Sequence, residues 1–156
     1  MIFGVIIPVT AIFVVVVGMG ILAIADLRWA EVDNWSTAAL SVAVLLALVH
    51  DEIVAAQWVS AFLCAGAVFA CYLELGVRGN MGGGDVKLSP VPALVLGAIN
   101  PFLAIWGVAL GFCLQAAIHV VSRGSNIAAD KPLPHVPSMF VATTVTALAG
   151  AALFQY

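Results

Sequence analysis

The chain has 156 residues, of which 64% are hydrophobic and only 8% are charged, whereas typical soluble domains are about 25% charged. Its mean hydropathy of +1.19 excludes a soluble fold of this size, so the sequence predicts an all-α membrane helical bundle forming a single domain over residues 1–156. The formal net charge of −3 says little alone, because the positions of the charges matter more than their sum.

Six apolar stretches are expected to cross the membrane, because a membrane helix needs about 20 apolar residues. They cover residues 2–25, 35–49, 53–77, 86–99, 101–121 and 136–156. The first stretch is predicted to be retained, since no basic segment precedes it and it is longer than the apolar part of a signal peptide. The stretches 35–49 and 86–99 are short. The second contains Pro90 and Pro92, which membrane helices tolerate where neighbours satisfy the freed carbonyls.

The segment 26–35 joins the first two stretches and is the most polar part of the chain up to that point. Asp33 or Asn34 is expected to cap the following helix, because both residue types are favoured caps. Asp26 lies at the end of the first stretch, where an ionisable side chain is a functional candidate. The structural alternative is that Asp26 forms an interfacial ion pair with Arg28.

The following segments carry polar residues that favour structural roles. Glu74 and Arg78 have the i,i+4 spacing of a helical ion pair. The cysteines all lie in apolar runs without a CxxC pair, so neither a zinc site nor a disulfide framework is indicated. The histidines have no ligand spacing, and no metal site is expected. These residues are Cys64, Cys71 and Cys113, and His50, His119 and His135.

The stretch 79–88 is the strongest interruption of the apolar pattern. Gly82, Gly83 and Gly84 precede Asp85, and glycine allows another chain to approach closely. Asp85 is therefore one half of a predicted catalytic pair, although an aspartate in this position is also a favoured helix cap. Lys87 is expected either to neutralise part of the charge of the pair or to extend to the membrane interface.

The positive charges predict the orientation of the chain. All of them fall in, or directly beside, the first, third and fifth connections between the apolar stretches: Arg28, Arg78, Lys87, Arg123 and Lys131. By the positive-inside rule these connections are cytoplasmic, which places both termini on the outer face. Asp26 and Asp85 are then expected at the same, cytoplasmic face of the membrane, where helix packing could bring them together.

Two carboxylates in one site indicate aspartic-protease chemistry. They cannot easily both ionise, so one keeps a proton. The ionised one activates a water, the protonated one donates a hydrogen bond to the scissile carbonyl, and the pair titrates as a unit. This chemistry requires neither a metal nor a nucleophilic side chain. It does require an extended peptide, and the glycines before Asp85 would expose backbone groups for strand-like pairing with it.

Two short motifs resemble those of a known family. Gly82–Asp85 matches a GxGD element, and Val86–Leu88 matches the residues that often follow it. Asp26–Arg28, with Val32 and Asn34, resembles the first aspartate segment of the same family, although Asp33 stands where that segment has proline. The chain thus resembles the type IV prepilin peptidases, which are GxGD-type intramembrane aspartic proteases.

The resemblance implies that Asp26 and Asp85 are catalytic and that Gly82, Gly83 and Gly84 bind substrate. It also implies supporting roles for Arg28, Asn34 and Lys87.

The resemblance further implies an activity, a substrate and a location. Such enzymes remove the basic leader of prepilins at the inner face of the cytoplasmic membrane, after a glycine and before an apolar helix. Larger relatives carry a loop with four zinc-binding cysteines and N-methylate the product. Because this sequence lacks that loop, we expect a peptidase without methyltransferase activity, cofactor or metal. Its expected partners are a prepilin-like substrate and the lipid bilayer, with no nucleic acid. A homo-oligomer is left open.

Other function classes explain the sequence less well. A transporter or channel subunit could use the same aspartates as proton-relay groups, but both are expected at one membrane face, and no internal repeat is evident. A non-catalytic scaffold explains neither the glycines nor the two acids. Nucleotide binding is excluded because the glycines lack both the GK[ST] ending of a P-loop and GxGxxG spacing.

Overall fold

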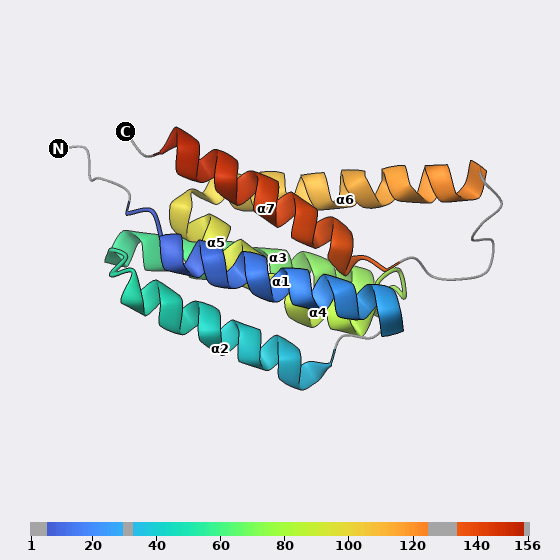
Figure 1. The fold of residues 1–156 in the computed structure, drawn as a ribbon, viewed down its shortest axis with the longest axis horizontal. Helices are drawn as coiled ribbons and strands as arrows, with labels where there is room; N and C mark the ends of the chain where they lie inside the picture. The colour runs from blue at the N-terminus through green and yellow to red at the C-terminus, as the bar shows by residue number, and fades with distance from the viewer. Residues whose placement is uncertain (1–5, 30–32, 125–133, 155–156) are drawn as a thin grey trace.

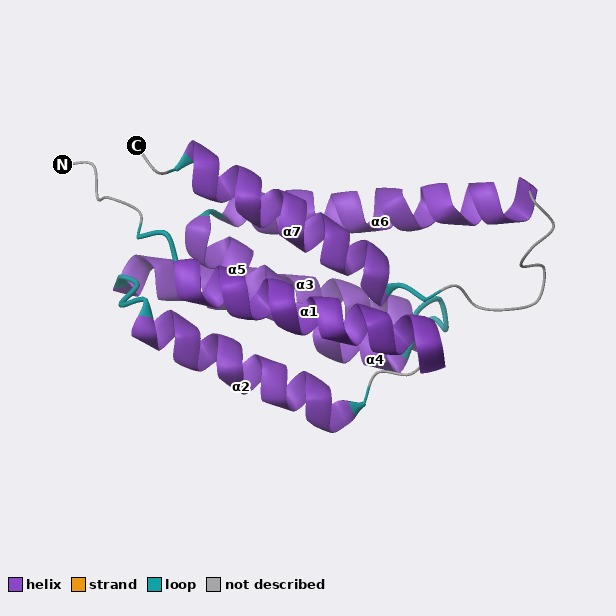
Figure 2. Cartoon of the chain, in the orientation of Figure 1, coloured by secondary structure: helices purple, strands orange, loops and turns teal. Residues whose placement is uncertain are grey.

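The computed structural model describes residues 6–29, 33–124 and 134–154. Over these residues the chain is helical and contains no strand (Figure 2), which confirms the predicted all-α class. The helices are α1 (Val9–Trp29), α2 (Asn34–His50), α3 (Ala55–Val77), α4 (Gly83–Leu88), α5 (Pro90–Ile99), α6 (Pro101–Gly124) and α7 (Val136–Leu153).

Among the described residues, four helices are long and apolar enough to cross a membrane: α1, α3, α6 over Pro101–Ser122, and α7. The helix α2 is also apolar but has only 17 residues. Many large apolar side chains point outward from the bundle, among them Phe13, Leu63 and Trp106. In a membrane these side chains face lipid rather than water, so the predicted membrane helical bundle is confirmed.

The first helix lies later in the chain than the expected span over 2–25. It begins at Val9, after Pro8, and continues to Trp29. Asp51 fixes this start, because its carboxylate accepts the backbone N–H groups of Thr10 and Ala11 at 3.2 and 2.9 Å. The shift places Asp26 within the last turn of α1.

The start of α2 agrees with the sequence. Asp33 is its N-cap, and one carboxylate oxygen accepts the N–H groups of Trp35 and Ser36 at 3.2 and 3.3 Å. The capping prediction for Asp33 or Asn34 is therefore confirmed for Asp33.

The expected single span over 86–99 is two helices that meet at Ser89. Pro90 begins α5, and Pro92 lies in its first turn, where the missing N–H groups would have no intrahelical partner in any case. The helix α5 is nevertheless the centre of the bundle, since all its residues from Val91 to Ile99 are buried.

Close packing between α3 and α5 fixes that centre. A Cβ added to Gly97 would lie 2.7 Å from Cβ of Cys64, so only glycine allows this approach. Ser60 Oγ donates to the carbonyl of Gly97 at 2.6 Å, and the buried Gln57 amide donates to the carbonyls of Ala98 and Ile6 at 2.8 and 2.7 Å. These bonds hold α5 against α3 and against the residues that precede α1.

The connections alternate between the two ends of the bundle (Figure 1). The last turn of α1, the α3–α4 connection and the start of α7 lie at one end, which we call the open end. The start of α1, the α2–α3 connection and the α5–α6 junction at Asn100 lie at the other, which we call the closed end. This alternation places the predicted site residues at one end. The orientation of that end in the membrane stays a prediction.

Candidate active site

Asp26 is buried in the last turn of α1, with 7% of its surface exposed. Its Oδ2 accepts the backbone N–H of Val136, the first residue of α7, at 3.2 Å. The start of a long helix carries partial positive charge and favours a carboxylate. Arg28 is exposed, and among the described residues no ion pair joins it to Asp26, since positions i and i+2 lie on different helix faces. The ion-pair alternative for Asp26 is therefore wrong.

Asp85 is the third residue of α4 and is partly buried. The N-cap of this helix is Gly82, so the alternative that Asp85 is the cap is wrong. Burial, and to a smaller extent the charge of Asp26, together raise the pKa of the Asp85 carboxyl to about 6, while a hydrogen bond from the backbone N–H of Gly82 acts in the opposite direction. Asp85 thus holds a proton more readily than an ordinary aspartate.

A cavity of about 580 Å³ at the open end brings the two acids together. The α3–α4 connection forms one side of it, α6 another, and the residues before α7 a third. Its lining residues are Asp26, Gly79, Asn80, Met81, Gly82, Asp85, Phe112, Gln115, Pro134 and His135. The sequence expectation that Asp26 and Asp85 come together is therefore met, with both carboxylates beside a space large enough for part of a peptide.

The glycines before Asp85 do not form an extended edge in this structure. Gly83 and Gly84 are the first two residues of α4, and only Gly82 has extended backbone angles, with φ −68° and ψ 144°. A Cβ on Gly82 would lie 3.3 Å from Oδ2 of Asp85, whereas one on Gly83 would meet no atom within 4 Å. Gly82 therefore permits a close approach to Asp85, and the strand-like pairing surface expected for Gly82–Gly84 is absent from this conformation.

Two of the three expected supporting residues contact each other. Lys87 Nζ donates to Oδ1 of Asn34 at 2.7 Å and so connects α4 to the start of α2. Lys87 lines an apolar groove beside the cavity rather than the cavity itself. The expected ion pair between Glu74 and Arg78 is confirmed at 2.7 Å. Arg78 is therefore paired with Glu74 rather than with Asp26 or Asp85.

Sequence reasoning missed an aromatic cluster beside the cavity, of which Phe112 and His135 line the cavity itself. The rings of Tyr72, Phe112 and His135 lie 5.3–5.9 Å apart between centroids, and the Tyr72 hydroxyl shares a 3.2 Å hydrogen bond with Nε2 of His135. No local pattern predicts a cluster drawn from three distant segments. The one sequence signal is a lone histidine directly before an apolar helix.

Over the described residues, no group of three or more His, Cys, Asp or Glu side chains is placed to hold a metal ion.

Comparison with known protein families identifies the family of the chain. The type IV leader peptidase family matches residues 13–154, which is 142 of the 156 residues. The chain belongs to the type IV leader peptidase family. No curated protein and no solved structure matched the chain.

Membership in the type IV leader peptidase family indicates the general activity of the chain. Together with the apolar helices, it identifies a membrane peptidase of the prepilin type. The matched region includes both aspartates, the glycine stretch and the aromatic cluster. The resemblance stated from the two motifs is thus confirmed at the level of the family.

Proposed function

We propose that the chain is an aspartic endopeptidase that removes the basic leader from prepilin-like substrates at the cytoplasmic face of the membrane, with Asp26 and Asp85 as its catalytic residues. The observation that carries the proposal is the shared cavity. Two acids distant in sequence line it, and Asp85 has a raised pKa, of about 6, partly because Asp26 is near. Perturbed acids in a cavity are what acid–base catalysis needs.

The roles of the two acids follow from their surroundings. Asp26 accepts a backbone N–H at the start of α7, and this hydrogen bond favours the ionised form of its carboxyl. Asp85, whose carboxyl has a pKa of about 6, is the better holder of the shared proton. We therefore assign Asp26 as the base and Asp85 as the acid, within a pair that titrates as a unit.

The reaction then proceeds in two stages. Asp26 takes a proton from a water molecule while the oxygen of that water attacks the scissile carbonyl carbon. At the same time Asp85 donates its proton to the carbonyl oxygen. The tetrahedral intermediate collapses when its C–N bond breaks, the nitrogen takes the proton from Asp26, and the hydroxyl returns a proton to Asp85. The products are a carboxyl group on the leader and a free amine on the pilin, and both acids return to their starting states.

Charge in the neighbourhood supports this division of roles. Lys87 is held by Asn34 and Arg78 by Glu74. A cation against the pair would favour loss of the shared proton. Neither of these two cations lines the cavity, so the acids keep the environment that the mechanism needs.

The charge distribution supports a cytoplasmic location for the site. Arg28 and Arg78 lie at the open end, in the last turn of α1 and directly after α3, and positive charge favours the cytoplasmic side. A leader peptide that remains in the cytoplasm would reach the cavity from that side. That the chain cleaves without N-methylating its product stays a prediction.

The test is co-expression of the chain with a candidate prepilin that has a basic leader, a glycine and an apolar helix. Cleavage is followed as a mobility shift on a gel. We expect Asp26→Asn and Asp85→Asn each to abolish the shift while the protein still inserts in the membrane. Asp51→Asn, at the closed end, is the matched control and should still cleave.

Two outcomes would contradict the proposal. Cleavage by either active-site variant at the wild-type rate would remove that acid from the mechanism. Proton-coupled flux in vesicles, without proteolysis of any such substrate, would favour the transporter alternative instead.

A further inference from the structure

His135 lines the cavity and is nevertheless almost fully buried. It directly precedes α7 and is only 5% exposed. Its ring packs against those of Phe112 and Tyr72, with centroid distances of 5.4 and 5.9 Å. A buried polar ring in such a cluster requires a reason, because it gives up hydration on folding.

Among the described residues, one of the two ring nitrogens of His135 has a hydrogen-bond partner and the other has none. Nε2 shares its hydrogen bond with the Tyr72 hydroxyl, while Nδ1 is buried and has no hydrogen-bond partner among the described residues. Burial lowers the pKa of His135 to about 4, so the ring is neutral at physiological pH. Burying this unpartnered nitrogen costs folding free energy. The neutral ring adds no positive charge beside the acids.

The next residue in the chain connects His135 to Asp26. The backbone N–H of Val136 is the donor to Oδ2 of Asp26, and the Val136 side chain is fully buried. Any movement of His135 moves this N–H group, because the two residues share a peptide bond. The Tyr72–His135 hydrogen bond thus fixes, through one residue, the donor that orients the Asp26 carboxylate.

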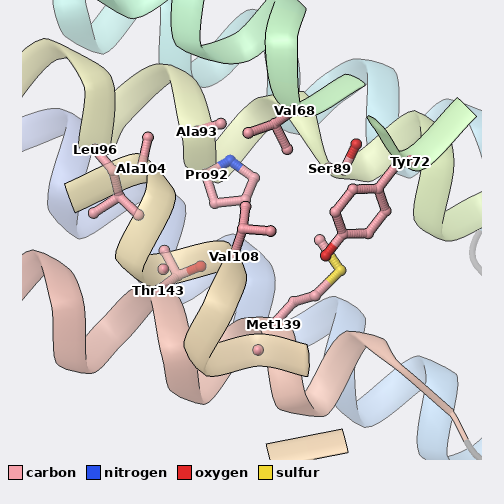
Figure 3. Close-up of a pocket in the computed structure, with 12 residues that line it drawn as sticks. Val68, Tyr72, Ser89, Pro92, Ala93, Leu96, Ala104, Val108, Met139 and Thr143 are labelled. Atoms are coloured by element: carbon pink, nitrogen blue, oxygen red, sulfur yellow. The ribbon is translucent and has the colours of Figure 1, made fainter. Parts of the chain in front are cut away.

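Tyr72 is itself fixed by packing inside the bundle. It lines a small interior void of about 20 Å³ together with Ser89 and Met139. Figure 3 shows the Tyr72 ring beside Ser89, with its hydroxyl directed toward Met139. Tyr72 is 1% exposed, so its hydroxyl can anchor His135 from a position fixed by packing.

We propose that His135 is a positioning residue for Asp26, acting through the backbone N–H of Val136 and anchored by the hydroxyl of Tyr72. The proposal rests on the proposed function in so far as Asp26 is one of its two acids. The titratable groups that face this contact come from four elements: Asp26 from α1, Tyr72 from α3, Asp85 from α4, and His135 itself before α7.

Paired amide substitutions test which ring nitrogen matters. In His135→Gln the amide can take the position of Nε2 and keep the bond to Tyr72, whereas in His135→Asn the amide takes the position of Nδ1 and the bond is lost. We expect His135→Asn and Tyr72→Phe to lower kcat by about 10- to 100-fold with little change in KM, because misplacing a reacting group costs that much. His135→Gln should retain most of kcat.

A second measurement needs no substrate. The carboxyl titration of Asp26 is followed in the purified protein by infrared or NMR spectroscopy, with Asp26→Asn to assign the signal. We expect it to shift in His135→Asn and Tyr72→Phe, and to stay near wild type in His135→Gln.

The outcomes separate this proposal from the proposed function. If His135→Gln is as impaired as His135→Asn, or if the Asp26 titration is the same in every variant, the positioning role is overturned. If the titration shifts as expected but no prepilin-like substrate is cleaved by the wild type, the positioning of Asp26 stands and the proposed peptidase reaction fails.

Discussion

The two ends of the bundle use the same interaction for different purposes. At the closed end Asp51 accepts two backbone N–H groups at the start of α1, at 3.2 and 2.9 Å. At the open end Asp26 accepts one N–H at the start of α7, at 3.2 Å, and a second acid lines the same cavity. An aspartate at a helix start is therefore not diagnostic of function. Its surroundings decide whether it caps a helix or remains available for chemistry.

Packing separates the two ends in the same way. Near the closed end, α3 and α5 approach until only glycine fits at position 97, and Gln57 and Ser60 satisfy the carbonyls around it. Around the open end, a cavity of about 580 Å³ remains. One buried ring nitrogen of His135 there has no hydrogen-bond partner among the described residues. Unfilled volume and unpaired polar atoms cost stability, and the proposed function accounts for that cost at the open end.

The largest expected effect comes from exchanging aspartate for asparagine at each end. In purified enzyme, Asp26→Asn and Asp85→Asn should lower kcat by about a thousandfold or more, because acids that act as a unit fail together. Asp51→Asn should leave kcat near wild type but lower the free energy of unfolding by about 1 kcal/mol, through the weakened helix start. Rate measurements and thermal unfolding in detergent give both quantities. A large kcat loss in Asp51→Asn alone would reverse the assignment of the two ends.

A smaller effect, on stability, is expected where α3 and α5 meet. Gly97→Ala places a methyl group 2.7 Å from Cβ of Cys64 and 3.2 Å from Cα of Ala61, and overpacking of this kind costs about 1–3 kcal/mol. Gly66→Ala, in the middle of α3, meets no atom within 4 Å and should be neutral or stabilising. Midpoints of thermal unfolding measure the difference. Equal midpoints for the two variants would show that this contact is not tight.

The smallest effect is expected beside Asp85. A methyl group from Gly82→Ala would press on the Asp85 carboxylate at 3.3 Å, and we expect a loss of about tenfold in kcat from the displaced acid. The backbone angles of Gly82 are open to alanine, so folding should be unaffected. Gly83→Ala, one residue later, meets no atom and should be close to wild type. A comparable loss in Gly83→Ala would instead indicate that substrate passes against both glycines.

Much of the arrangement could be predicted from the sequence because it depends on local patterns. The apolar runs predicted the long helices, Asp33 was among the predicted caps of α2, and the i,i+4 spacing predicted the Glu74–Arg78 ion pair. The alternation of basic connections placed Asp26 and Asp85 at one end, which the structure bears out. These features require only neighbouring residues or the parity of the spans.

The features that could not be predicted depend on contacts between distant segments. The start of α1 is set by Asp51, about 40 residues away in sequence. The break at Ser89 follows from Pro90, yet a single kinked helix was equally consistent with that proline. The partnership of Tyr72 with His135 spans 63 residues, and nothing in either local sequence marks it. The helical state of Gly83 and Gly84 was missed because three adjacent glycines suggested an extended loop.

The pH titration of Asp85, with and without Asp26, tests most directly whether the open end holds two acids that act as one unit. In the wild type the pKa of Asp85 should be about 6. In Asp26→Asn it should fall, because one negative charge has been removed, but it should remain above the ordinary value since burial is the larger cause. In the active pair the rate, measured as kcat/KM, should decline as the pH rises through this value and the shared proton is lost. An Asp85 pKa that is ordinary in the wild type, or unchanged by the loss of Asp26, would contradict a shared site.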